Sequence, residues 1–138
     1  MSKVFLDTNI LVYSLDKADA AKRDRCRDLI KGLACDNRGV ISTQVMQEFY
    51  VAATNKLGAD PLIIKDILRA LERFETILIT PELIRDAIDC QIINRLSFWD
   101  ALIIVAAESA HCDVLWTEDL NDGQIIRGVR IENPLKPR

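Results

Sequence analysis

The sequence predicts an α/β domain in which helices cover both faces of a central, mainly parallel sheet of about five strands. Short apolar or β-branched runs bounded by polar residues recur along the chain, and segments with helical spacing separate them. Strands that alternate with helices imply right-handed crossovers and parallel pairing. No linker or repeat interrupts residues 1–138, and 49% hydrophobic content at this length fits a single domain with one core.

Five runs are predicted to be strands, and helices are expected between them. The strands are residues 3–6, 39–41, 76–79, 113–116 and 129–131. Residues 43–57 and 63–74 have helical spacing, and in the second segment apolar side chains alternate with charged ones as in an amphipathic helix. Asp60 and Thr80 each precede a proline, and a capping side chain before a proline predicts a helix start.

Composition excludes several classes of protein. The longest uninterrupted apolar run, residues 101–107, is far shorter than the roughly 20 residues that span a bilayer, so we expect a cytoplasmic protein without membrane contact. Cys26, Cys35, Cys90 and Cys112 form no C-x-x-C pair, which argues against zinc and thioredoxin-like chemistry and predicts reduced, mostly buried thiols. The single histidine, His111, is expected at a helix end rather than in catalysis.

Charge is unevenly distributed along the chain. The net charge is −3, yet residues 17–38 and 127–138 each carry +3, so the remaining residues sum to −9. This pattern is consistent with an acidic centre flanked by basic surfaces that contact phosphates. Solvated helix faces are the simpler explanation, and a pI of about 5.2 favours them over a general nucleic-acid binder.

Four carboxylates occupy unusual positions. Asp7 and Asp119 follow predicted strands, where ligand sites of open α/β sheets lie. Glu48 and Asp100 fall on largely apolar helical faces, and a buried carboxylate is costly unless it is paired or bound to a cation. A local role is also open for each of them: Asp7 as a helix N-cap, Glu48 in an ion pair, Asp100 beside an N-cap at Ser97, and Asp119 in an acidic surface loop, as we expect for Glu118 and Asp122.

If the four carboxylates converge, they require neutralisation. Two carboxylates about 4 Å apart repel each other by about 4 kcal/mol at an effective dielectric constant near 20, and domains are stable by only about 5–15 kcal/mol. Protons or a hard cation must therefore compensate. A site with oxygen ligands and neither His nor Cys favours Mg²⁺ or Mn²⁺, and such a centre suits hydrolysis of phosphodiester bonds.

Four segments in this order carry a resemblance to a known family: residues 4–13 (VFLDTNILVY), 42–50 (STQVMQEFY), 97–104 (SFWDALII) and 116–124 (WTEDLNDGQ). The sequence resembles the PIN-domain nucleases, especially VapC-type toxins of toxin-antitoxin pairs. The resemblance implies a PIN fold and a Mg²⁺- or Mn²⁺-dependent endoribonuclease acting on RNA. It carries the acidic ligands over to Asp7, Glu48, Asp100 and Asp119, with Thr8, Asn9 and Thr117 as supporting residues, and implies a homodimer inhibited by a small antitoxin.

The predicted mechanism assigns metal binding to Asp7, Asp100 and Asp119, while Glu48 completes the shell or orients the attacking water. A haloacid-dehalogenase-type enzyme would need a second aspartate where Asn9 stands, and a response-regulator receiver would need a lysine between Lys65 and Lys136. The remaining alternative is a catalytically silent PIN-fold module that binds RNA or protein. The homodimer is expected to pair the basic residues 17–38 across a symmetric interface.

Overall fold

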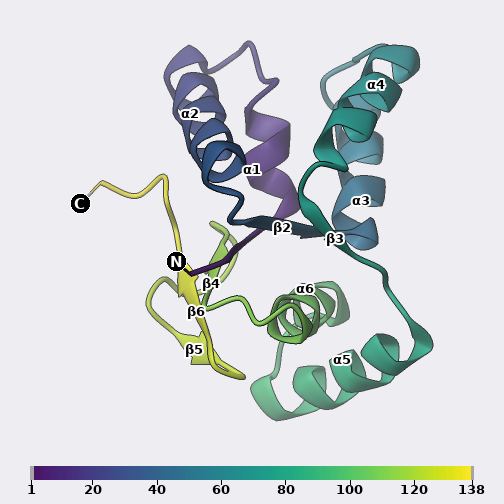
Figure 1. The fold of residues 1–138 in the computed structure, drawn as a ribbon, viewed down its shortest axis with the longest axis vertical. Helices are drawn as coiled ribbons and strands as arrows, with labels where there is room; N and C mark the ends of the chain where they lie inside the picture. The colour runs from purple at the N-terminus through teal and green to yellow at the C-terminus, as the bar shows by residue number, and fades with distance from the viewer. Residues whose placement is uncertain (1, 138) are drawn as a thin grey trace.

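The structure is a computed structural model and describes residues 2–137. Within these residues a six-stranded sheet combines with six helices (Figure 1). In chain order the elements are β1 (Val4–Leu6), α1 (Thr8–Tyr13), α2 (Ala20–Asp36), β2 (Gly39–Ser42), α3 (Thr43–Asn55), α4 (Pro61–Leu71), β3 (Glu75–Ile77), α5 (Pro81–Asn94), α6 (Phe98–Ser109), β4 (Val114–Trp116), β5 (Ile125–Ile126) and β6 (Val129–Glu132).

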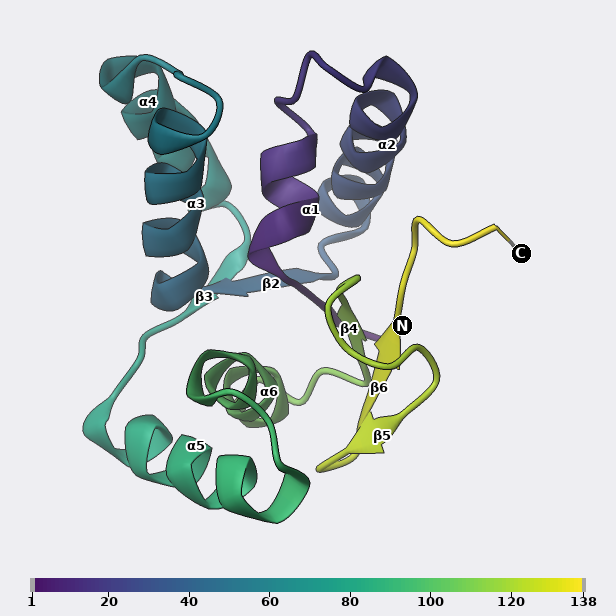
Figure 2. The ribbon, with the colours of Figure 1, turned by 180° about the vertical axis from the view of Figure 1, so that it is seen from behind.

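The sheet has the strand order β3-β2-β1-β4-β6-β5, and every neighbouring pair is parallel except β5 with β6. Helices α1 to α4 lie on one side of the sheet, and α5 and α6 lie on the other (Figures 1 and 2). Within the sheet, β2 pairs with one side of β1, and β4, which comes later in the chain, pairs with the other side. The carboxyl ends of β1 and β4 therefore form the topological switch point at which ligands bind in open α/β sheets.

All five predicted strands are present, with bounds shifted by up to two residues, and the predicted α/β class with helices on both faces is confirmed. The sixth strand, β5, was not predicted. It has only two residues and joins β6 through Arg127 and Gly128, whose φ angles of 51° and 79° place both in the left-handed region. This backbone suits a two-residue hairpin turn, but Arg is an unusual residue for its first position.

The predicted helix starts are confirmed by their caps. The side chains of Asp60, Thr80 and Ser97 accept hydrogen bonds from backbone N–H groups in the first turns of α4, α5 and α6. Residues 101–107 of α6 are all buried, because the sheet covers one side of this helix and α5 lies against the other. The apolar character of α6 all round its axis thus reflects its place between two layers.

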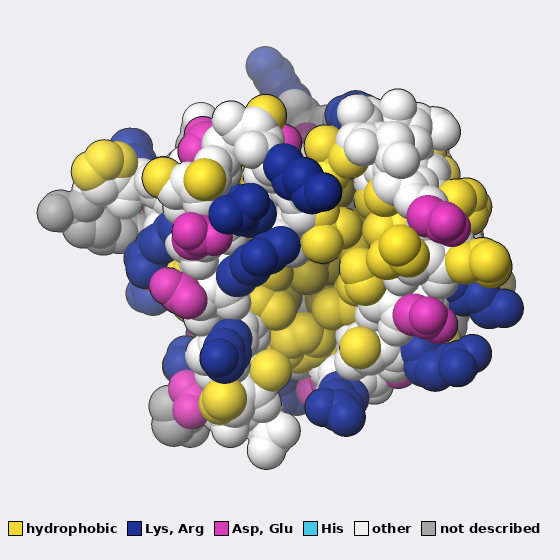
Figure 3. Space-filling view, turned by 90° about the horizontal axis from the view of Figure 1, so that it is seen from above, with side chains coloured by type: hydrophobic (Ala, Val, Ile, Leu, Met, Phe, Trp, Pro, Cys, Tyr) yellow, Lys and Arg dark blue, Asp and Glu magenta, His cyan; other side chains and the backbone are white. Residues whose placement is uncertain are grey.

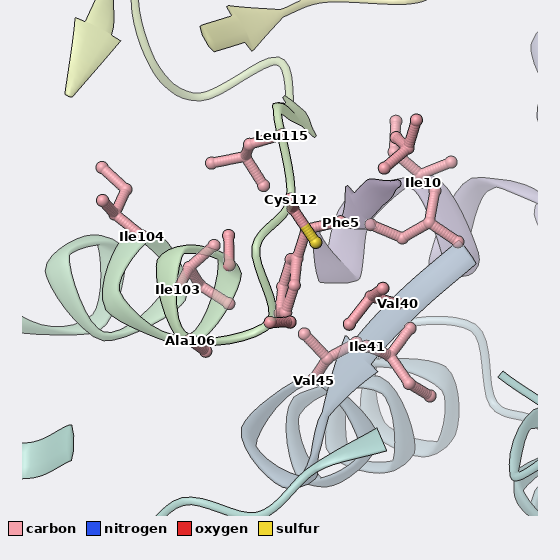
Figure 4. Packing of buried hydrophobic residues seen from close by; sticks show 14 of the residues in the cluster. Phe5, Ile10, Val40, Ile41, Val45, Ile103, Ile104, Ala106, Cys112 and Leu115 are labelled. Atoms are coloured by element: carbon pink, nitrogen blue, oxygen red, sulfur yellow. The ribbon is translucent and has the colours of Figure 1, made fainter. Parts of the chain in front are cut away.

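The core extends over both faces of the central strands. In Figure 4 the ring of Phe5 lies between α6 and β2, and Phe5, Ile104 and Leu115 are fully buried. Three of the four cysteines are buried and all four are free thiols, as expected. At the start of β2 the ring of Phe74 occupies the space of a side chain at Gly39, since a Cβ there would lie 2.3 Å from the ring.

No single helix among residues 2–137 is both long and apolar enough to span a membrane; only α5 and α6 taken together meet that criterion, as a pair bent by 115°. His111 lies just beyond the end of α6 with a φ of 59°, in keeping with the expected position at a helix end.

Candidate active site

Asp7 is the first residue beyond β1 and lies at the switch point. The parallel register sets Leu6 opposite Trp116, so the chain continues into Asp7 and Thr117 on neighbouring strands at the same height. The Asp7 carboxylate accepts hydrogen bonds from the Thr8 backbone N–H at 2.7 Å and from the Thr117 hydroxyl, also at 2.7 Å. The expected N-cap role of Asp7 is therefore present, but it uses only one of the two carboxylate oxygens.

Burial sets the electrostatics of Asp7. The residue is 7% exposed, and burial raises the pKa of its carboxyl to about 6 from an ordinary 3.8. Hydrogen bonds from Thr117 and Thr8 oppose this shift, whereas the charges of Asp119 and Glu48 add to it. Near neutral pH the site thus holds a buried negative charge that its hydrogen bonds compensate only in part.

Two neutral side chains at the start of α1 hold two further carboxylates. The Thr8 hydroxyl donates to Glu48 Oε1 at 2.8 Å, and the Asn9 amide donates to Asp119 Oδ2, also at 2.8 Å. Burial and the charge of Asp100 raise the pKa of Asp119 above its ordinary value. Residues 8 and 9 therefore connect carboxylates that lie 40 and 110 positions away in the sequence.

Asp100 belongs to the first turn of α6, and its backbone N–H donates to the N-cap hydroxyl of Ser97 at 3.1 Å. The backbone of Asp100 thus satisfies the local capping interaction while its side chain lines the site. An open cleft of about 590 Å³ is lined by all four predicted acids together with Thr8 and Asn9, whereas Thr117 is fully buried behind Asp7. The structure therefore places the four predicted acids and their three predicted supporting residues at one site.

The carboxylates line the walls of the cleft without forming a closed ligand shell. Within residues 2–137 no three His, Cys, Asp or Glu side chains lie close enough together to coordinate one ion. Thr8 and Asn9 donate to Glu48 and Asp119 respectively, so each of these carboxylates is positioned by its own neutral partner. The four predicted acids therefore share one cleft but are not gathered into a closed group of ligands.

The donor set nevertheless fits a hard cation. The four acids offer only oxygen ligands, and none of them forms an ion pair within the part of the chain that the structure describes. Glu48, for which an arginine partner was a possible explanation, accepts its hydrogen bond from Thr8 instead. Asp7 is buried, Glu48 and Asp100 are half-buried and Asp119 is exposed, and carboxylates without cationic partners retain the charge and the lone pairs that Mg²⁺ or Mn²⁺ requires.

The residues of the cleft that were not predicted include Gln44, Trp99 and Lys56. Gln44 is 4% exposed and its amide donates to the Trp99 carbonyl at 3.1 Å, which joins α3 to the first turn of α6. Its Oε1 atom is buried and accepts no hydrogen bond from a residue that the structure describes. Two of these residues have a signal in the sequence. Gln44 lies one helical turn before Glu48, and Trp99 is adjacent to Asp100.

Glu118 and Asp122 have other partners. Glu118 accepts a hydrogen bond from the Tyr13 hydroxyl, and its carboxylate lies 3.4 Å from Lys22 Nζ. Asp122 accepts from the Asn133 backbone N–H at 2.8 Å. Both side chains lie outside the lining of the cleft, as expected for residues of a surface loop.

The fold and the site define an α/β domain with a carboxylate-lined cleft at the switch point of a parallel sheet. Residues 4–123 match the model of the PIN domain family, and the chain therefore belongs to this family. Among curated proteins, none matches the sequence significantly.

Solved structures of VapC-type toxins share the fold over nearly the whole chain. A toxin-antitoxin complex from Klebsiella pneumoniae matches with a TM-score of 0.72 and 21% identity over 98% of this chain and 100% of the other. The sarcin-ricin loop cleaving toxin VapC20 of Mycobacterium tuberculosis matches with a TM-score of 0.68 and 16% identity over 85% and 92%. DNA-bound VapBC from Salmonella typhimurium gives 0.68 and 21% over 97% and 99%. At these identities the likeness concerns the fold.

Proposed function

We propose that the protein is a metal-dependent endoribonuclease that hydrolyses phosphodiester bonds in RNA. The observation that carries the proposal is the set of four carboxylates, Asp7, Glu48, Asp100 and Asp119, that line one cleft with only neutral hydrogen-bond partners. Asp7 is buried and Glu48 and Asp100 are half-buried without an ion pair to any described residue, whereas acids needed only for stability are normally paired with cations or placed in solvent. Membership of the PIN domain family and the fold of an RNA-cleaving toxin support the same function.

Asp7, Asp100 and Asp119 would hold Mg²⁺ or Mn²⁺, and Glu48 would complete the ligand set or orient the attacking water. When bound, the ion supplies Lewis-acid activation of the scissile phosphate and lowers the pKa of a bound water. The chain positions these ligands through Thr117, which donates to Asp7, and through Asn9, which donates to Asp119. Thr8 donates to one carboxylate oxygen of Glu48, which leaves the second oxygen available to a water molecule.

The toxin role belongs to the same proposal, with a small antitoxin protein as the partner. Two of the similar folds were solved as toxin-antitoxin or VapBC complexes. Viewed from the side of α1 to α4, the surface has a hollow floored by hydrophobic side chains, with Lys and Arg gathered mainly along one side (Figure 3). Between α2 and α4 a groove is lined by Ile30, Ile67 and Phe74 among others. An amphipathic antitoxin segment with acidic residues would match both the apolar floor and the basic rim.

We also propose a homodimer, with α5 as the contact in place of the basic residues 17–38. Ile84, Ile88 and Ile92 are spaced by four residues and are 41%, 44% and 70% exposed, so α5 presents an apolar stripe to solvent. A second copy of the same helix supplies a matching stripe by two-fold symmetry. Light scattering at micromolar concentrations tests this proposal: Ile88→Glu is expected to lower the mass to that of one chain, and a monomeric wild type throughout would contradict it.

The proposed activity is tested with the purified chain and a mixed RNA pool. Cleavage is expected with Mn²⁺ or Mg²⁺, and EDTA is expected to abolish it. Binding of RNA without cleavage under all of these conditions would favour the silent binding module. For the toxin role, a neighbouring reading frame is expected to encode a small DNA-binding protein whose co-expression suppresses both cleavage and growth arrest.

A further inference from the structure

We propose that Trp99 is a stacking platform for the nucleobase next to the phosphate that is cleaved. This inference rests on the proposed nuclease function and assigns a residue that binds its substrate. Trp99 lines the acidic cleft and is 60% exposed, in contrast to the other tryptophan, Trp116, which is partly buried in β4. A large aromatic side chain at the surface, adjacent in sequence to the carboxylate of Asp100, requires an explanation.

Two contacts position Trp99, one to its ring and one to its backbone carbonyl. The ring of Phe98 meets the Trp99 ring edge to face at 5.1 Å between centroids and 76° between planes. The Gln44 amide donates to the Trp99 carbonyl at 3.1 Å, which ties this first turn of α6 to α3. The Phe98 contact restrains the indole and the Gln44 bond fixes the backbone that carries it, so less side-chain entropy is lost when a ring stacks on Trp99.

The chemistry of the cleft indicates what that ring is. The cleft is strongly acidic, so a negatively charged partner gains little from it except where a cation is bound. An aromatic face supplies affinity that does not depend on charge, and every nucleobase has a face that can stack on it. Because bases in a duplex are already stacked on their neighbours, only an unpaired or extruded base can use the platform.

The end of the cleft away from Trp99 carries a positive charge, which complements the negative charge of an RNA phosphate. Lys56 is the one cation among the described residues that line the cleft, and it ends α3, whereas Gln44 lies near the start of this helix. Twelve residues of helix correspond to roughly 18 Å. A strand whose base stacks on Trp99 can therefore pass the four carboxylates and place a later phosphate near Lys56.

The test compares Trp99→Ala and Trp99→Phe with Ile125→Ala, which removes an equally exposed apolar side chain of β5 outside the cleft. Affinity is measured by anisotropy of a fluorescein-labelled octauridine in the cleavage-deficient Asp100→Asn background with Mn²⁺. We expect Trp99→Ala to weaken binding by about 5- to 150-fold, as removal of a base-stacking aromatic does. Trp99→Phe is expected to retain most of the affinity, and Ile125→Ala all of it.

Two further measurements make the inference specific. With a blunt, fully paired RNA hairpin, Trp99→Ala is expected to bind like the parent chain, and in the active chain it is expected to raise KM for single-stranded RNA more than it lowers kcat. Equal octauridine affinity for Trp99→Ala and its parent would overturn the inference, even if cleavage by the wild type upholds the nuclease. A lower mass of Trp99→Ala in light scattering with unchanged RNA affinity would likewise overturn it, in favour of a protein contact. Loss of RNA affinity in Trp99→Ala from a chain that never cleaves would uphold the platform and refute the nuclease.

Discussion

Carboxylates have different partners at the two edges of the sheet: the amino edge, where the parallel strands begin, and the carboxyl edge, where they end. At the amino edge, Lys3 precedes β1 and donates to Glu75 of β3 at 2.9 Å and to the Ala110 carbonyl at 3.0 Å, with both charged side chains largely exposed. At the carboxyl edge, the carboxylate of the buried Asp7 receives hydrogen bonds from Thr8 and Thr117 and forms no ion pair with a described residue. The chain thus pairs an acid with a cation at the amino edge and leaves acids at the switch point without such a partner among residues 2–137. The location of unneutralised charge, rather than the number of acids, identifies the site.

The largest expected effect is on catalysis. Asp100→Asn is expected to lower RNA cleavage by more than the about 10- to 100-fold that loss of an outer-shell partner costs at metal sites, because it removes a ligand charge. Without metal the variant is expected to be as stable as the wild type or more stable, since repulsion with Asp119 is relieved. Cleavage assays and thermal unfolding with and without Mn²⁺ measure both effects. Wild-type cleavage by Asp100→Asn would disprove the ligand assignment, and Glu75→Gln at the amino edge serves as the control that should cleave normally.

The second prediction concerns pH. The pKa of Asp7 is raised from 3.8 to about 6 by burial, so the folded protein binds this proton more tightly than the unfolded chain does. Unfolding then releases a proton between pH about 4 and about 6, and the free energy of unfolding falls as the pH rises through this range. The full loss is about 3 kcal/mol above pH 6.

Urea unfolding in EDTA between pH 4.5 and 7.5 measures this dependence. Asp7→Asn is expected to remove it, whereas substitution of the exposed Asp66 on α4 should leave it in place. An unchanged pH slope in Asp7→Asn would show that another group is responsible.

A smaller effect is expected at the support behind Asp7. The hydroxyl of Thr117 donates to Asp7 at 2.7 Å and accepts from the Asp119 backbone N–H at 3.1 Å. Thr117→Val keeps the shape but leaves buried polar groups without a partner, which is expected to cost roughly 1–3 kcal/mol of stability and to raise the Mn²⁺ concentration that cleavage requires. Thr117→Ser retains the hydroxyl and should behave like the wild type. Equal stability of the Val and Ser variants in chemical unfolding would refute this role.

The smallest effect is expected at the amino edge. Glu75→Gln removes the exposed ion pair with Lys3, and such pairs contribute little because water and salt screen them. We expect the urea midpoint to change less than in Thr117→Val, and the change to vanish at high salt. A destabilisation larger than that of Thr117→Val would mean that the two edges differ less than the contacts indicate.

Local patterns predicted the parts of the molecule that local chemistry determines. Strand ends, helix caps such as Ser97, and acids that follow strands depend on neighbouring residues, and the structure places them as expected. The hairpin strand β5 was not predicted because a run of two residues has no detectable periodicity. An arginine at position 127 also does not indicate a left-handed turn.

Long-range contacts account for the rest. The bond from Gln44 to Trp99 spans 55 positions and that from Asn9 to Asp119 spans 110, so neither follows from sequence spacing. The convergence of the carboxylates on one cleft could be predicted from the topology and the family, but their hydrogen-bond partners could not.

The strands at the two ends of the sheet have a consequence for assembly. β3 has three residues and β5 has two, so each outer strand offers few unpaired backbone groups to a neighbouring chain. Such short outer strands discourage pairing of one sheet with another, which is the usual first step toward fibrous aggregates. An extended peptide would thus find only a short backbone template at either outer strand.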